Sequence, residues 1–171
     1  RTKQLEENPV AELEYPKLRK SLPKYLTLEQ SAALLQAVSG QNEKRDYAIL
    51  MLFLNCGIRR SELVNLNISD VYEDRIRVVG KGNKERMVPV SPYLAKALMQ
   101  FQIVRGGYFE GRLAQKFVFL SYRGRKMTQE SITKVLKEAA RAVGVNPQIR
   151  VSPHTCRHTF AHLQLKNGLD L

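Results

Sequence analysis

Apolar residues recur at helical spacing over most of the chain, beginning directly after Thr27. Leucine, alanine and valine side chains at positions 28, 32, 34, 35 and 38 precede Gly40, and Gln30 stands three residues after Thr27. That threonine–glutamine spacing is typical of a capping box, in which each side chain bonds the other residue's backbone N–H. The pattern predicts a helix that begins after Thr27 and ends before Gly40.

A second helix is predicted from Glu43 to Cys56. Its run from Tyr47 to Leu54 is apolar on nearly every side, which is typical of a helix buried at the centre of a domain. Gly57 should end this helix, because glycine is favoured directly after a helix. A short third helix should follow at residues 59–66.

The periodicity changes from helical to alternating between Val71 and Val90. Two alternating segments, 75–79 and 85–90, flank the loop GKGNK, a pattern that predicts a β-hairpin. Helical patterns return at 92–104, 129–143 and 153–167. We therefore predict an α+β fold, mainly α, with one small three-stranded antiparallel sheet.

The first 22 residues differ from the rest of the chain. They are charged and interrupted by prolines at positions 9 and 16, with a third proline at 23. Because apolar periodicity is weak there, an extended connector is predicted. A plain disordered terminus fits the composition equally well.

The charge of the chain points to a polyanionic partner. Lys and Arg number 28 against 16 Asp and Glu, so the formal net charge is +12. Such an excess is the footprint of nucleic-acid binding, with a membrane surface as the second possibility. The longest apolar run, Ala48 to Leu54, is far below the ~20 residues needed to span a bilayer. We expect no membrane partner.

Cysteine usage and the N-terminal sequence bear on location. Two cysteines, Cys56 and Cys156, occur in 171 residues, which indicates reduced thiols rather than a disulfide framework. No secretory pattern opens the chain. A cytoplasmic location is expected.

The segment GIRRSEL at 57–63 is the first that could carry chemistry. Arg59 follows a helix-ending glycine, so its guanidinium is held on rigid structure and could bind two phosphate oxygens at once. Glu62 lies three residues later, on the same face of the short helix, and could orient the guanidinium. Taken alone, the two residues fit a surface ion pair better.

The segment VVGKGNKERMVPV at 78–90 places Lys81 between two glycines of the hairpin loop. A lysine there could donate a proton to a leaving alkoxide if nearby arginines lower its pKa. Most basic loops of this kind only contact backbone phosphates. A nucleotide-binding loop is excluded, because GKGNK lacks the GxxxxGK[ST] spacing and leads into a strand.

The segment SPHTCRH at 152–158 places His154 and Arg157 on one face near the start of the last helix. A helix N-terminus favours anions, so the pair could exchange a proton and hold a phosphate. Histidines at 154, 158 and 162 also have a spacing that permits zinc, but no HExxH motif or second Cys/His cluster accompanies them. We rank zinc well below phosphate, and expect His158 and His162 to serve packing and hydrogen bonding.

In this order, the three segments resemble the catalytic domain of tyrosine recombinases, the phage integrase family, of the bacterial Xer type. The resemblance extends from about Asn8 to Leu171. It implies a catalytic domain at residues 23–171, joined by residues 1–22 to a DNA-clamping domain that precedes this chain. Four of the family's six active-site positions are matched: Arg59, Lys81, His154 and Arg157.

The resemblance also implies the reaction. The family breaks and rejoins DNA strands in site-specific recombination or integration, by tyrosine attack that gives a 3′-phosphotyrosine, without metal or cofactor. All seven tyrosines of this chain precede the HxxR motif, whereas the family's nucleophile follows it. We therefore expect the nucleophile and the last histidine or tryptophan beyond Leu171, and this chain alone to be inactive.

Double-stranded DNA is the partner that the resemblance implies, bound by a homotetramer that assembles through the segment beyond Leu171. A bacterial, nucleoid-associated location follows. The residues expected to contact DNA are Lys84, Arg86, Arg123, Arg125, Lys126, Thr128, Gln129 and Lys134. Two alternatives remain: a non-catalytic DNA-binding module, in which these cations only hold phosphates, and an enzyme related to type IB topoisomerases.

Overall fold

The computed structural model describes residues 24–106, 116–121, 123–144 and 150–168. The predicted connector at residues 1–22 lies outside them. In chain order the elements are α1 (Leu28–Gln36), α2 (Glu43–Cys56), α3 (Arg60–Asn65), the 3-10 turn η1 (Ile68–Asp70), β1 (Arg75–Val79), the 3-10 turn η2 (Lys81–Asn83), β2 (Glu85–Pro89), α4 (Pro92–Arg105), α5 (Gln129–Val143) and α6 (Pro153–Lys166).

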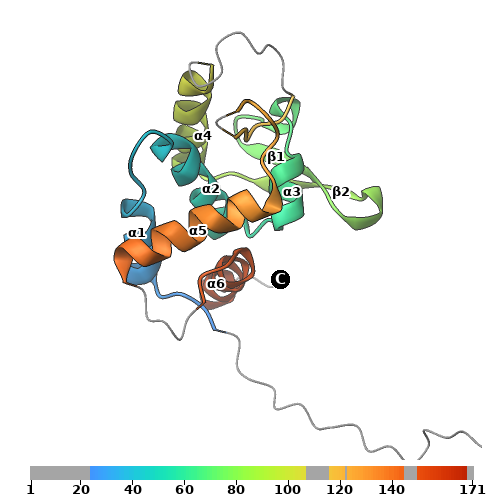
Figure 1. Cartoon of the computed structure of the whole chain (residues 1–171). Helices are drawn as coiled ribbons and strands as arrows, with labels where there is room; N and C mark the ends of the chain where they lie inside the picture. The colour runs from blue at the N-terminus through green and yellow to red at the C-terminus, as the bar shows by residue number, and fades with distance from the viewer. Residues whose placement is uncertain (1–23, 107–115, 122, 145–149, 169–171) are drawn as a thin grey trace, which may run out of the picture.

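Helix α2 forms the centre of the domain, as its apolar run predicted. Every side chain from Ala48 to Phe53 is buried, and α2 packs against α1, α4, α5 and α6. Figure 1 shows α5 and α6 on one side of α2 and α4 on another. Because α2 is covered on several sides, the residues at its C-terminal end are held on rigid structure.

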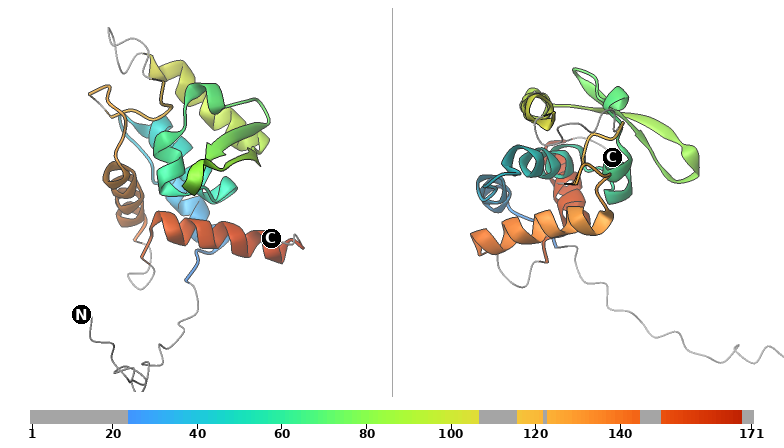
Figure 2. Two further views of the ribbon diagram at one scale, coloured as in Figure 1. Left: turned by 90° about the vertical axis from the view of Figure 1, so that its right-hand side faces the viewer. Right: turned by 45° about the horizontal axis from the view of Figure 1, so that its top comes forward.

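The described residues form a sheet of two strands, so the prediction of a third strand was wrong. Strands β1 and β2 pair antiparallel, with Val78 opposite Arg86, and the hairpin projects from the helical body (Figure 2). Outside the hairpin, the segment 116–118 pairs with the chain just after α3 through a single bridge between Asn67 and Phe117. An isolated bridge does not continue the ladder, so no third strand joins the hairpin there.

Local signals set the ends of α1 and α2. Thr27 and Gln30 form the predicted capping box, and Gly57 ends α2 in the left-handed conformation, at φ 54°. A Cβ at Gly57 would lie 2.4 Å from Cδ1 of Phe160 on α6. The turn after α2 therefore requires glycine for its backbone conformation and for the close approach of α6.

The residues before α1 are attached to α6. The backbone N–H of Leu26 donates to Oγ1 of Thr159 at 2.9 Å, and the ring of Tyr25 stacks on His162 with centroids 3.8 Å apart. Thr159 is fully buried. His162 thus serves packing, as the sequence predicted.

Neither thiol is placed for reactivity. Burial raises the pKa of Cys56 and that of Cys156 to about 12 each, and both are free cysteines. They pack as small apolar side chains. In the part of the chain that the structure describes, no helix is long and apolar enough to cross a bilayer.

Candidate active site

The turn after α2 presents the first candidate residue. Gly57 reverses the backbone, and Arg59 then stands in an extended conformation as the residue that precedes α3. Its side chain is 56% exposed. The guanidinium is thus accessible while its backbone is fixed by the buried end of α2.

Glu62 is the centre of a cluster formed by Arg59, Glu62 and Arg86, here called the arginine–glutamate cluster. Its side chain is 1% exposed. It accepts hydrogen bonds from the backbone N–H of Arg59 at 2.7 Å and from Nη1 of Arg59 at 3.0 Å. Arg86 adds a bidentate contact, at 2.7 Å from Nη1 and 2.9 Å from Nη2.

These bonds determine the charge of the carboxylate. Burial acts to raise the pKa of Glu62, but the hydrogen bonds from Arg86 and Arg59 outweigh it and lower the pKa to about 2. Glu62 is therefore ionised at neutral pH, and it fixes the orientation of both guanidinium groups.

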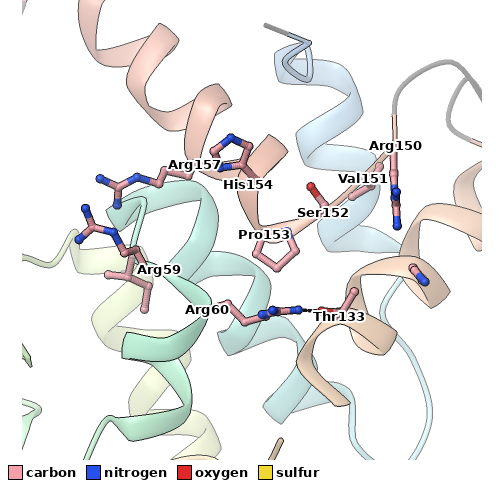
Figure 3. A pocket seen from close by; sticks show the side chains of 11 residues that line it. Arg59, Arg60, Thr133, Arg150, Val151, Ser152, Pro153, His154 and Arg157 are labelled. Atoms are coloured by element: carbon pink, nitrogen blue, oxygen red, sulfur yellow. Dashed lines mark hydrogen bonds between the residues drawn. The ribbon is translucent and has the colours of Figure 1, made fainter. Parts of the chain in front are cut away.

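Arg157 approaches the same turn from α6. Its Nη1 donates a hydrogen bond to the carbonyl oxygen of Gly57, and Figure 3 shows its guanidinium beside that of Arg59. Burial and the neighbouring charge of Arg59 lower the pKa of Arg157, while Glu62 opposes the shift. Arginine stays charged at neutral pH despite such shifts. Two cations are thus held close together, and the carboxylate of Glu62 acts on the charge of both.

His154 lies one turn before Arg157 on α6 and is exposed. Its Nε2 is 2.8 Å from Nε2 of His158, so one ring donates and the other accepts. His158, expected to serve packing and hydrogen bonding inside the domain, thus has the exposed candidate residue His154 as its partner. Within the described ranges, no group of three or more His, Cys, Asp or Glu side chains is arranged to hold a metal ion.

A cavity of about 630 Å³ opens between α3, α5 and the start of α6 (Figure 3). Among the described residues that line it, the charged ones are all cationic: Arg59, Arg60, Lys137, Arg150 and Arg157. Pro153 and His154 line it as well. A cavity with this lining favours a phosphate-bearing ligand.

Three of these cations were not predicted as site residues. Arg60 donates to Oγ1 of Thr133 at 3.0 Å, which joins α3 to α5 across the cavity. Lys137 extends from α5, and Arg150 comes from the segment that precedes α6. The adjacency of Arg60 to Arg59 was the one available signal, because the positions of Lys137 and Arg150 depend on how α5 and α6 pack.

Lys81 begins the turn η2 at the end of the hairpin, and its side chain lies outside what the structure describes. The backbone next to it is close to the arginine–glutamate cluster, since a Cβ at Gly80 would lie 3.5 Å from Oε1 of Glu62. Gly82 and Asn83 adopt left-handed conformations, at φ 74° and φ 58°, which makes the turn tight. The hairpin loop therefore meets α3 at the site.

The predicted DNA contacts differ in their exposure and in the contacts that they make with other residues of the domain. Arg86 belongs to the arginine–glutamate cluster. Lys126 donates to Oδ1 of Asn65 and lies 4.5 Å over the ring centroid of Phe117. Lys84, Arg123 and Arg125 are exposed.

Three of the predicted DNA contacts, Thr128, Gln129 and Lys134, lie at or near the start of α5. Thr128 caps the helix by accepting from the backbone N–H of Ser131. Gln129 is half-buried. Lys134 is exposed and lies 3.6 Å from Glu138.

Comparison with known proteins decides the family. Residues 24–171 match the Phage integrase family. The chain belongs to this family. The family expected from the three sequence segments is thus confirmed.

Relatives of this family member include tyrosine recombinase XerC of Caldanaerobacter subterraneus subsp. tengcongensis. The two are 40% identical over 168 residues, which cover 98% of this chain and 47% of XerC. The crystal structure of XerA recombinase superposes with a TM-score of 0.78 at 33% identity, covering 88% of this chain and 53% of XerA.

A third similarity shows the fold alone. The XerH site-specific recombinase, solved bound to its difH substrate before cleavage, gives a TM-score of 0.72 at 22% identity, over 86% of this chain and 44% of XerH. The chain spans about half the length of XerC and of XerA.

Proposed function

We propose that the chain is the catalytic domain of a tyrosine recombinase, which breaks and rejoins DNA strands in site-specific recombination. The observation that supports this most is the convergence of Arg59 and Arg157 at the turn of Gly57, beside His154. Two neighbouring guanidinium groups on different helices suit the two non-bridging oxygens of one phosphodiester.

The proposed reaction is the one that the family resemblance implies, with these residues in the roles that it gives them. A tyrosine oxygen attacks phosphorus, a tyrosine–phosphate bond forms, and the bond from phosphorus to the 5′-oxygen breaks. Arg59 and Arg157 stabilise the charge that develops on the non-bridging oxygens. Lys81 gives a proton to the departing 5′-oxygen, and His154 assists proton transfer near the nucleophile. The products are a 3′-phosphotyrosine and a free 5′-hydroxyl.

The nucleophile belongs, in this proposal, to a segment beyond Leu171. Every tyrosine of the chain precedes the HxxR motif. Among them, Tyr25 is engaged in stacking on His162. Residues 1–22 would connect this domain to a preceding DNA-clamping domain, and the assembled form on DNA would be a tetramer in the bacterial cytoplasm.

Duplex DNA is the proposed substrate, because five cations line the cavity and the net charge is +12. Exposed Lys84, Arg123 and Arg125 would contact backbone phosphates around it. Thr128, Gln129 and Lys134 at the start of α5 would reach into a groove.

Covalent trapping tests the proposal. The chain extended beyond Leu171 by its natural coding sequence is incubated with a nicked suicide substrate, and protein–DNA adducts are counted on a denaturing gel. We expect an adduct with the extended chain and none with the 171-residue chain. Arg59→Ala and Arg157→Ala should each lower adduct formation by more than about 10²-fold, with much smaller losses in DNA binding.

Three outcomes would contradict the proposal. An extended chain that binds DNA but never forms an adduct would favour the non-catalytic module. An adduct with the 171-residue chain would show that the nucleophile is within it, and Tyr122→Phe would be the first variant to test. Relaxation of supercoils without exchange between duplexes would favour the topoisomerase-like alternative.

A further inference from the structure

Arg86 has a contact that DNA binding does not require. Both of its terminal nitrogens bond Glu62, at 2.7 and 2.9 Å, across a sequence separation of 24 residues. Its place on β2, opposite Val78 of β1, makes it part of the hairpin that carries Lys81. In the described residues, the side chain of Arg86 thus joins this hairpin to α3.

The bidentate contact also affects Arg59. Arg86 takes up both oxygens of Glu62, and the backbone N–H of Arg59 adds a third bond at 2.7 Å. The guanidinium of Arg59 bonds the carboxylate through Nη1 alone, at 3.0 Å. Its other donors can therefore point to a ligand, while the charge of Glu62 is balanced mainly by Arg86.

The hairpin loop lies close to this contact. A Cβ at Gly80 would be 3.5 Å from Oε1 of Glu62 and 3.9 Å from Nη1 of Arg86. The backbone N–H of Gly80 bonds the carbonyl oxygen of Lys84 at 2.8 Å, so the loop closes directly above the Arg86–Glu62 pair. A change in this pair would move the residue that follows Gly80.

We propose that Arg86 is a positioning residue for the leaving-group step: by binding Glu62 it holds the Lys81 loop at the distance from Arg59 that proton donation to the 5′-oxygen needs. This inference rests on the proposed function. It replaces the expected role of Arg86 as a phosphate contact, because its guanidinium is committed to a buried carboxylate.

A sulfur substitution in the DNA isolates this step. When the 5′-bridging oxygen is replaced by sulfur, the leaving group is a thiolate, which departs without a proton because thiols have a pKa of about 8.5. Adduct formation by the extended chain is timed on matched oxygen and sulfur substrates. Arg86→Gln should slow the oxygen substrate by about 10²-fold and leave the sulfur substrate close to the unsubstituted protein. Lys81→Ala should behave in the same way, and Arg59→Ala should be slow on both.

Arg77→Gln is the matched control. Arg77 lies on β1 of the same hairpin and bonds Asp70 at 2.6 and 2.9 Å, so its loss also removes a hairpin ion pair, but away from Glu62. Arg77→Gln should lower the melting temperature and leave the rates of adduct formation on the oxygen and sulfur substrates unchanged. Arg86→Lys keeps the charge and loses the bidentate geometry, and it serves as the second variant if Arg86→Gln does not fold.

Several results would overturn the inference. Equal slowing on oxygen and sulfur substrates would place Arg86 in charge stabilisation or in general folding. If Arg86→Gln loses DNA affinity by the same factor as it loses rate, Arg86 is a phosphate contact. If Arg86→Gln forms adducts as fast as Arg77→Gln, Arg86 does not position the Lys81 loop. If the unsubstituted extended chain forms no adduct on either substrate, the proposed function fails and this inference with it.

Discussion

Replacing Glu62 by glutamine tests whether the buried carboxylate stabilises the fold through its charge. Glutamine keeps the size of the side chain but removes the charge that two guanidinium groups share. The pKa of Glu62 falls from 4.5 to about 2 in the folded chain, and each pKa unit corresponds to about 1.4 kcal/mol. The shift thus corresponds to about 3 kcal/mol, and solvent around the half-exposed guanidinium groups reduces this to about 2 kcal/mol.

The pH dependence has a definite sign. A carboxyl group whose pKa is lower in the folded than in the unfolded state stabilises the fold above the unfolded value. The difference in unfolding free energy between the unsubstituted chain and Glu62→Gln should therefore be constant above pH ~5. It should shrink as the pH falls from 4.5 toward about 2, the unfolded and folded pKa values of Glu62.

Urea unfolding followed by circular dichroism, repeated from pH 7 to pH 3.5, measures this difference. Glu85→Gln is the control, since Glu85 is 51% exposed and lies 3.4 Å from Arg77, and its loss should matter little at any pH. A difference for Glu62→Gln that is the same at pH 7 and pH 3.5 would refute the reasoning, because it would show that shape rather than charge carries the effect.

Three further predictions concern other parts of the domain. Gly57→Ala should lower the unfolding free energy by about 2 kcal/mol or more, because it adds a clash to a left-handed backbone. Gly144 is also left-handed but has open space around it, so Gly144→Ala should cost only about 1 kcal/mol in the same urea titration. Cys56 and Cys156, with pKa values of about 12, should not react with a thiol reagent until the chain is unfolded in guanidinium, and rapid labelling of native protein would contradict their burial. Lys137→Ala should reduce the slope of log affinity for duplex DNA against log salt by about one; an unchanged slope would place this lysine outside the DNA contact.

The sequence predicts those parts of the fold that depend on neighbours in the chain. The capping box of Thr27, the end of α2 at Gly57 and the hairpin around Lys81 all follow from residues within a few positions of one another. The third strand was wrong for the opposite reason. No segment outside the hairpin was assigned to that strand, and which chain the segment 116–118 pairs with depends on packing between distant segments, which periodicity does not report.

In the candidate site, too, local motifs could be predicted from the sequence and contacts between distant segments could not. Arg59, His154 and Arg157 could be named because short motifs carry them, and the structure brings them to one cavity. The bond from Arg86 to Glu62 could not be predicted. The alternation of a strand indicates which face of the hairpin Arg86 lies on, but not which residue of another element it contacts. Arg150 and Lys137 were missed for a similar reason, since they meet only through the packing of α5 and α6.

The attachment of Tyr25 and Leu26 to α6 determines where the chain enters the domain. Thr159, which holds Leu26, is two residues from Arg157 on the same helix. A tag, a fluorophore or a fused protein placed just upstream of Tyr25 would therefore sit beside the helix that carries His154 and Arg157. Tension applied at that entry point would act on α6 through these two contacts as well as on α1 through the backbone, so it would reach the helix that lines the cavity.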